Sequence, residues 1–194
     1  MKTTMLKLCF IGFTAIAFTA CSGDDDDDPT PPVSDEEVIT DLRLTFTDSE
    51  GTSQTFSFSD PDGEGGNVPV LDIISLTPDA YTVSIEVLDA SNPNDVEDIT
   101  AEILEKDEEH QFFFVTSGSA SDVVTIAYVD ADADGRPIGL STIWVVSDIT
   151  EGAGSVAVTL LHEPNKTAEG IAIDNPSVAG GETDIEVLFD FVAQ

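Results

Sequence analysis

Apolar and polar residues alternate with a period of two through much of the chain after residue 36. Leu42, Leu44 and Phe46 fall on one side of such a pattern, and the residues between them are Arg43 and Thr45. Successive side chains of a strand point to opposite faces, so this alternation predicts a strand with one buried face. The pattern recurs over residues 81–87 and 185–191. Further strand candidates are residues 55–59, 68–76, 111–117, 123–129, 138–147 and 155–162.

These eight or nine short strands are separated by Gly, Asp, Asn and Pro, which favour turns. The pattern predicts an all-β fold, an antiparallel β-sandwich that is Ig-like or related. One short helix is expected over residues 98–110, with Asp98 or Thr100 as its N-cap and with Ile103 and Leu104 as its apolar contact. No repeat or second linker is present, so residues 36–194 are expected to form a single domain.

The aromatic residues support a strand covered on both faces. Phe112, Phe113 and Phe114 are consecutive, so Phe113 must point away from its two neighbours. We expect both faces of this strand to be buried, the alternative being an exposed binding patch at Phe113. Burial is also the expectation for Trp144.

The composition indicates that the chain can form an apolar core and that it carries a strong negative charge. Leu, Ile, Val and Phe make up 56 of 194 residues, enough for a folded core, while 39 Asp and Glu against 6 Lys and Arg give a net charge of -33. Nucleic-acid binding needs clustered basic residues, so nucleic acid is excluded as a partner, and anionic membrane surfaces are excluded for the same reason.

The first 20 residues have the features of a secretory signal peptide. Lys2 and Lys7 form a basic start, a mostly apolar run follows, and small residues precede Cys21. Residues 18–21 resemble the lipobox of bacterial lipoproteins, with Phe18 in place of the usual Leu. We therefore expect Cys21 to carry acyl chains of the palmitate type and to anchor the protein to the outer membrane. Cys9 lies within the signal, so Cys21 is the one mature cysteine and no intrachain disulfide can form.

Residues 21–35 are expected to form a tether. Five consecutive acids, Asp24 to Asp28, are followed by three prolines, and neither feature favours a packed structure. The sequence after Cys21 resembles the acidic export signal of Bacteroidetes surface lipoproteins, which implies exposure at the cell surface. A solvated spacer on a periplasm-facing lipoprotein is the alternative.

Two acidic loops are candidates for Ca²⁺. Asp130, Asp132 and Asp134 alternate before Gly135, the way in which oxygen ligands are concentrated on Ca²⁺. An EF-hand is excluded because Ser141 occupies its twelfth position, and a plain hairpin turning at residues 134–135 is the alternative.

The second loop, residues 60–67, offers Asp60, Asp62 and Glu64 among glycines. Its carboxylates also suit a hard cation. Solvated turns commonly have the same composition, so an ordinary loop is the alternative.

The two histidines both lie beside acids. Glu109 precedes His110, and Glu163 follows His162. If the fold brings these four side chains together, they suit Zn²⁺, whereas two locally hydrogen-bonded histidines are the alternative.

No catalytic set is apparent. The mature chain has no cysteine nucleophile apart from the expected lipidation site, no Gly-x-Ser-x-Gly elbow and no phosphate-binding glycine loop with Lys. The sequence therefore predicts that the protein is not an enzyme.

Several stretches together resemble one group of short Bacteroidetes surface lipoproteins. They are residues 37–40 (EVIT), 60–67 (DPDGEGGN), 108–114 (EEHQFFF), 136–142 (RPIGLST), 162–166 (HEPNK) and 180–187 (GGETDIEV). Members of the group sometimes carry the labels "type 1 periplasmic binding fold" or "GTP cyclohydrolase". The first implies two α/β lobes and the second Cys and His zinc ligands, and neither agrees with this chain.

These observations predict a non-catalytic accessory lipoprotein. It would capture a ligand or a metal at the outer membrane, with Ca²⁺ or Zn²⁺ as the candidate ions and a TonB-dependent receptor as the partner by analogy. The alternative is a structural or adhesive surface module stabilised by Ca²⁺.

Overall fold

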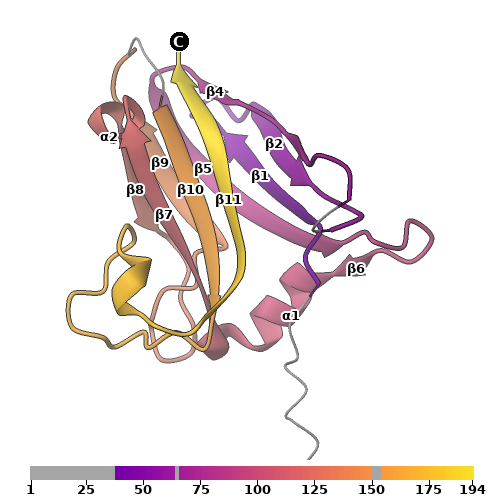
Figure 1. The fold of residues 1–194 in the computed structure, drawn as a ribbon. Coiled ribbons are helices and arrows are strands. Elements are labelled where there is room, and N and C mark those ends of the chain that lie inside the picture. The colour runs from indigo at the N-terminus through magenta and orange to yellow at the C-terminus, as the bar shows by residue number, and fades with distance from the viewer. Residues whose placement is uncertain (1–37, 64–65, 150–153) are drawn as a thin grey trace, which may run out of the picture. The chain divides into compact units, whose positions relative to one another are not determined.

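The three clearest alternating segments form long strands, β1 (Asp41–Thr47), β5 (Asp79–Asp89) and β11 (Glu182–Ala193). The structure, a computed structural model, describes residues 38–63, 66–149 and 154–194. The expected signal peptide, Cys21 and the tether therefore lie outside the described residues. Within them, the protein is mostly β, with two open sheets packed together (Figure 1).

The larger sheet has the order β3-β2-β1-β5-β9-β8, and β6 also pairs with β5. Every pairing in this sheet is antiparallel. Its remaining strands are β2 (Ser53–Ser59), β3 (Val70–Leu71), β6 (Glu97–Asp98), β8 (Val124–Tyr128) and β9 (Ser141–Val146).

The smaller sheet has the order β4-β11-β10-β7. Strands β7 (His110–Gly118), β10 (Gly154–His162) and β11 pair antiparallel, whereas β4 (Ile74–Leu76) runs parallel to β11. The described residues thus contain eleven strands instead of eight or nine, because one expected strand is divided into β3 and β4 and the short β6 was not expected.

Residues 68–76, expected as one strand, divide into β3 and β4 in different sheets. At the crossover, the Asp72 carboxylate accepts hydrogen bonds from the backbone N–H and the hydroxyl of Ser57, at 2.8 and 2.9 Å. These bonds hold the chain to the edge of the larger sheet while it turns toward the smaller one.

Aromatic side chains join the two sheets. The Trp144 ring lies edge-on to Phe46 and Phe114, with centroid distances of 5.1 and 5.8 Å, and all three side chains are buried. The indole N–H of Trp144 donates to the Thr142 hydroxyl at 2.9 Å, so its polar atom is satisfied. Burial of one such side chain stabilises the fold by about 1.5–3 kcal/mol.

Phe113 is buried on the opposite face of β7, where it packs with Leu161, Ala179 and Ile171. The last two belong to the long connection between β10 and β11, which covers this outer face. The expected burial of Trp144 and of both faces of the Phe112–Phe114 strand is confirmed.

The expected helix is present and shorter, as α1 (Ile99–Glu105), followed by the 3-10 turn η1 (Asp107–Glu109). Ile103 is buried, but Leu104 is exposed, so that part of the expected apolar contact was wrong. Asp98 makes no side-chain capping bond, and Thr100 instead exchanges hydrogen bonds with the backbone of Val87.

A second short helix, α2 (Ala120–Val123), and a 3-10 turn, η2 (Pro176–Val178), were not expected.

Candidate metal site

The two histidines are direct cross-strand partners at one end of the smaller sheet. His110 is the first residue of β7 and His162 the last residue of β10, and the register pairs them. Alternation places them on the same face as Phe112 and Leu160, which belong to the core. Their rings stack with centroids 4.9 Å apart and planes 8° apart. The inward face of the sheet thus changes from apolar residues to histidine at its end.

A β-bulge brings a carboxylate to this pair. Leu160 is opposite Ile185 and Leu161 is opposite Thr183, so Asp184 is an extra residue in β11. A bulge re-aims the side chains of the bulged strand. The Asp184 side chain is 5% exposed, and its Oδ2 lies 3.9 Å from Nε2 of His110.

Hydrogen bonding sets the orientation of His110. Its Nδ1 is 3.0 Å from the carbonyl oxygen of Lys106, just after α1. A carbonyl oxygen only accepts, so Nδ1 donates, and in the neutral ring Nε2 carries the lone pair. Such a backbone contact is typical of metal-binding histidines, whose ring is fixed by the nitrogen that does not bind the metal.

His162 is the more accessible histidine, with 24% of its side chain exposed. Its Nε2 lies 3.9 Å from Oε2 of Glu109, which is half-exposed at the end of η1. Glu109 and Glu163, expected as ligands together with the histidines, both lie outside the group of side chains close enough to share one ion. Glu163 is exposed and holds a left-handed backbone with φ of 50°. Its backbone N–H donates to the Glu109 carbonyl at 2.6 Å and so ties the end of β10 to η1.

Close backbone packing keeps this end of the sheet narrow. Gly181 has φ of 81°, and a Cβ at this position would collide with the carbonyl oxygen of His162. The glycine therefore allows the start of β11 to pass directly against the end of β10.

His110, His162 and Asp184 are the one group of three or more His, Cys, Asp or Glu in the described part of the chain that could hold a metal. One ligand atom from each lies within 4.8 Å of the other two. Tetrahedral Zn²⁺ with bonds of 2.0–2.1 Å needs ligand atoms about 3.3 Å apart. Zn²⁺ binding would therefore draw the three atoms closer together. The two stacked rings would also have to rotate relative to each other, because an imidazole binds a metal in its own ring plane.

The sequence thus identified both histidines but not Asp184. The one feature of the sequence that could have pointed to Asp184 is its position. It comes directly before Ile185, where the regular alternation of β11 begins. A bulge cannot be located from a period of two, because it is a break in that period.

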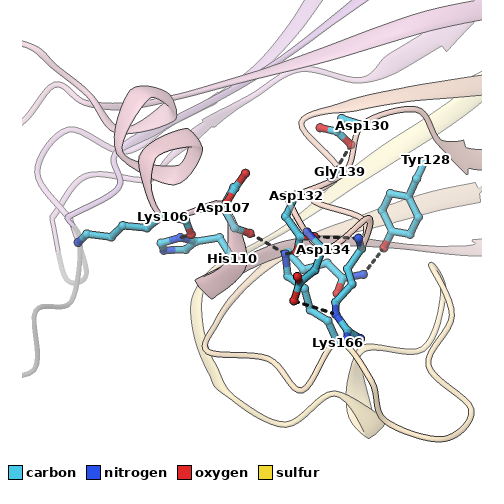
Figure 2. Close-up of polar contacts among 11 residues, drawn as sticks. Lys106, Asp107, His110, Tyr128, Asp130, Asp132, Asp134, Gly139 and Lys166 are labelled. Atoms are coloured by element: carbon cyan, nitrogen blue, oxygen red, sulfur yellow. Dashed lines mark hydrogen bonds and ion pairs between the residues drawn. The ribbon is translucent and has the colours of Figure 1, made fainter.

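The acidic hairpin at residues 130–135 is arranged around a lysine. Asp132 Oδ1 accepts from the backbone N–H groups of Asp134 and Arg136, and Oδ2 accepts from Lys166 Nζ at 2.9 Å. Lys166 also donates to the Asp107 carbonyl, as Figure 2 shows. The side chains of Lys166 and Asp132 are 3% and 1% exposed. An ammonium group therefore already neutralises Asp132.

The other two acids of this hairpin point elsewhere. Asp130 accepts from the backbone N–H groups of Gly139 and Ser141, at 2.8 and 2.9 Å. Asp134 is exposed beside Arg136. Since the three carboxylates do not converge, the geometry favours a hairpin, with Gly135 at φ of 79°, over a Ca²⁺ loop.

The acidic loop at residues 60–67 is described only in part, because Glu64 lies outside the described residues. Asp62 Oδ2 accepts from the backbone N–H and the side-chain amide of Asn67, at 2.8 and 2.7 Å. The backbone bond from Asn67 is the main reason that the pKa of Asp62 lies below its usual value. Ca²⁺ binding by Asp60, Asp62 and Glu64 stays a prediction.

Comparison with known proteins found no family model, no curated protein and no solved structure that matches the chain. The family resemblance drawn from the sequence motifs therefore stays a prediction. The metal site is therefore inferred only from the arrangement of His110, His162 and Asp184.

Proposed function

We propose that the protein is a non-catalytic lipoprotein that captures Zn²⁺ at the outer membrane. The observation that carries the proposal is the convergence of His110, His162 and Asp184 at one end of the smaller sheet. Two of these side chains are nearly buried, and the third reaches solvent. The site is thus held by the fold, and His162 is its most exposed ligand.

The chemistry of the ligands indicates the ion. Imidazole nitrogen suits Zn²⁺, Cu²⁺ and Ni²⁺, whereas Ca²⁺ and Mg²⁺ prefer sets composed of oxygen atoms. Three protein ligands leave one position of tetrahedral Zn²⁺ open, as in sites that exchange or activate a bound molecule. The sequence contains no recognisable catalytic motif, so we favour capture over catalysis.

The expected anchor at Cys21 and the acidic tether support a place at the cell surface. No helix among the described residues has the length and apolar character needed to cross a membrane. Transfer of the ion to a TonB-dependent receptor, an Ig-like strand topology and membership of the Bacteroidetes lipoprotein group stay predictions. A Ca²⁺-stabilised adhesive module has less support, because Lys166 neutralises the central acid of its best candidate loop.

Calorimetric titration of the purified mature chain with Zn²⁺ tests the proposal. We expect one ion per chain and a loss of affinity of at least about 10-fold in Asp184→Asn, which removes a ligand charge with little change of shape. Asp190→Asn is the matched control, because Asp190 is an exposed acid on the same strand. Equal affinity in wild type and Asp184→Asn, or no stoichiometric binding, would contradict the proposal. A separate Ca²⁺ titration of Asp130→Asn/Asp132→Asn tests the alternative.

A further inference from the structure

Glu109 has a fixed backbone and an accessible side chain. Its N–H donates to the Lys106 carbonyl at 2.9 Å, and its carbonyl accepts from Glu163 at 2.6 Å. The side chain is 54% exposed, with Oε2 3.9 Å from Nε2 of His162. The carboxylate can therefore move toward or away from the histidine pair without a change of the chain path.

The groups around the candidate metal site form a gradient of exposure. The side chains of His110 and Asp184 are 0% and 5% exposed, that of His162 is 24% exposed, and that of Glu109 is 54% exposed. An ion held by the first three residues would be covered by His110 and Asp184. Its open side would be the side of His162 and Glu109.

Charge balance favours a second carboxylate. Two neutral imidazoles and one carboxylate leave Zn²⁺ with a net charge of about +1 in a partly buried place, which is costly without a counter-charge. A second carboxylate brings the sum to zero and completes a tetrahedral set of two nitrogen and two oxygen ligands.

On this basis, and resting on the Zn²⁺ site proposed above, we propose that Glu109 is the fourth ligand and controls exchange of the ion. When the Glu109 carboxylate binds, it closes the one open coordination position. When it swings into solvent, a water molecule or a ligand from a receiving protein can take its place. The three remaining ligands hold the ion until transfer.

The competing candidates are the other acids nearby. Glu109 and Glu163 both lie outside the ligand group, but only the Glu109 carboxylate lies near it, at 3.9 Å from His162, whereas Glu163 is exposed on a left-handed turn. Glu182 is exposed and pairs with His162 in the β10–β11 register, so it is the strongest rival for the fourth position. Glu108 is a neighbour of Glu109 in η1 and serves as a control for the charge of the segment.

The test is the rate of Zn²⁺ release from the mature chain into excess chelator, measured by stopped flow with a chromophoric chelator. We expect Glu109→Gln to release the ion at least about 10-fold faster than wild type, as expected for loss of a ligand contact. We expect Glu108→Gln and Glu182→Gln to change the rate by about twofold or less, the scale of a screened surface charge. Circular dichroism confirms that each variant is folded.

Added acetate distinguishes a ligand role of Glu109 from a structural role. If Glu109 were only structural, acetate would not change the rate of Zn²⁺ release. A free carboxylate can occupy the position left by Glu109→Gln, so added acetate should slow release from this variant toward the wild-type rate. Sodium chloride at the same ionic strength should not.

The outcomes separate the two proposals. If wild type binds no Zn²⁺ stoichiometrically, the proposed function fails, and this inference fails with it. If wild type binds but Glu109→Gln releases at the wild-type rate, or Glu182→Gln has the larger effect, only the role of Glu109 is overturned.

Discussion

At the scale of single residues, Lys166 connects three segments through its ammonium group. It is a nearly buried cation in a chain with few basic residues, and it joins η1, the acidic hairpin and the β10–β11 connection. Burial alone would raise the pKa of Asp132, but the backbone N–H of Arg136 and the Lys166 ammonium outweigh burial and hold that pKa below 3.8. The stabilisation is therefore present above about pH 3.8 and is lost as the pH falls through the lower folded value.

Replacement of Lys166 by Met would leave the Asp132 carboxylate buried without its counter-charge. Removal of one partner of a buried ion pair costs about 3–5 kcal/mol, so we expect Lys166→Met to unfold at clearly lower urea concentration. Asp132→Asn keeps an acceptor for the backbone N–H groups, so the double variant Lys166→Met/Asp132→Asn should recover much of the loss. Equal loss in both variants would indicate that packing of the lysine stem, and not its charge, is responsible.

At the scale of elements, period-two alternation was a good guide to the long strands and a poor guide to their ends. It predicted β1, β5 and β11 because each has one face in the core. It missed the division of residues 68–76 between two sheets, because the crossover is held by hydrogen bonds that Ser57 of β2 donates to the Asp72 carboxylate. Asp98, one of the two expected N-cap residues, is the N-cap of α1 but makes no side-chain capping bond, and the other, Thr100, bonds to the backbone of Val87 instead.

For the candidate site, too, the local sequence pattern was informative, whereas the contacts between distant segments could not be predicted from it. The pairing of His110 with His162 requires the register of strands that are distant in sequence, and Asp184 requires a bulge. Neither the strand register nor the bulge can be predicted from the spacing of residues that are close in sequence. The sequence could supply the chemistry of the two histidines, and only the fold could supply their convergence.

Deletion of Asp184 tests the bulge as an element. Without it, Thr183 and Ile185 become consecutive opposite Leu161 and Leu160, so a regular strand would keep Ile185 in the core. We expect the deletion variant to remain folded, with a loss of stability of about 1 kcal/mol, typical of a single change, and to lose stoichiometric Zn²⁺ binding. Thermal unfolding followed by circular dichroism and a Zn²⁺ titration check both parts. A folded variant that still binds Zn²⁺ would show that Asp184 is not a ligand.

At the scale of the whole molecule, the net charge of -33 affects stability independently of any site. Like charges on the folded surface repel one another, and salt screens that repulsion over a Debye length of about 10 Å at 0.1 M. Any cation therefore stabilises this protein to some degree. A rise in melting temperature with Zn²⁺ is not, by itself, evidence for a specific site.

Specific binding and screening can be separated by comparing wild type with Asp184→Asn at matched ionic strength. We expect Na⁺ and Mg²⁺ to raise the melting temperature of both proteins to the same extent, since the two differ by one charge among 39 acidic residues. Zn²⁺ at a free concentration of 100 times its Kd should add about 2.7 kcal/mol to the stability of wild type. That gain corresponds to roughly 5–10 °C in a domain of this size and should be absent from Asp184→Asn. Equal Zn²⁺ effects on the two proteins in differential scanning calorimetry would mean that the ion acts through the acidic surface and not through the histidine pair.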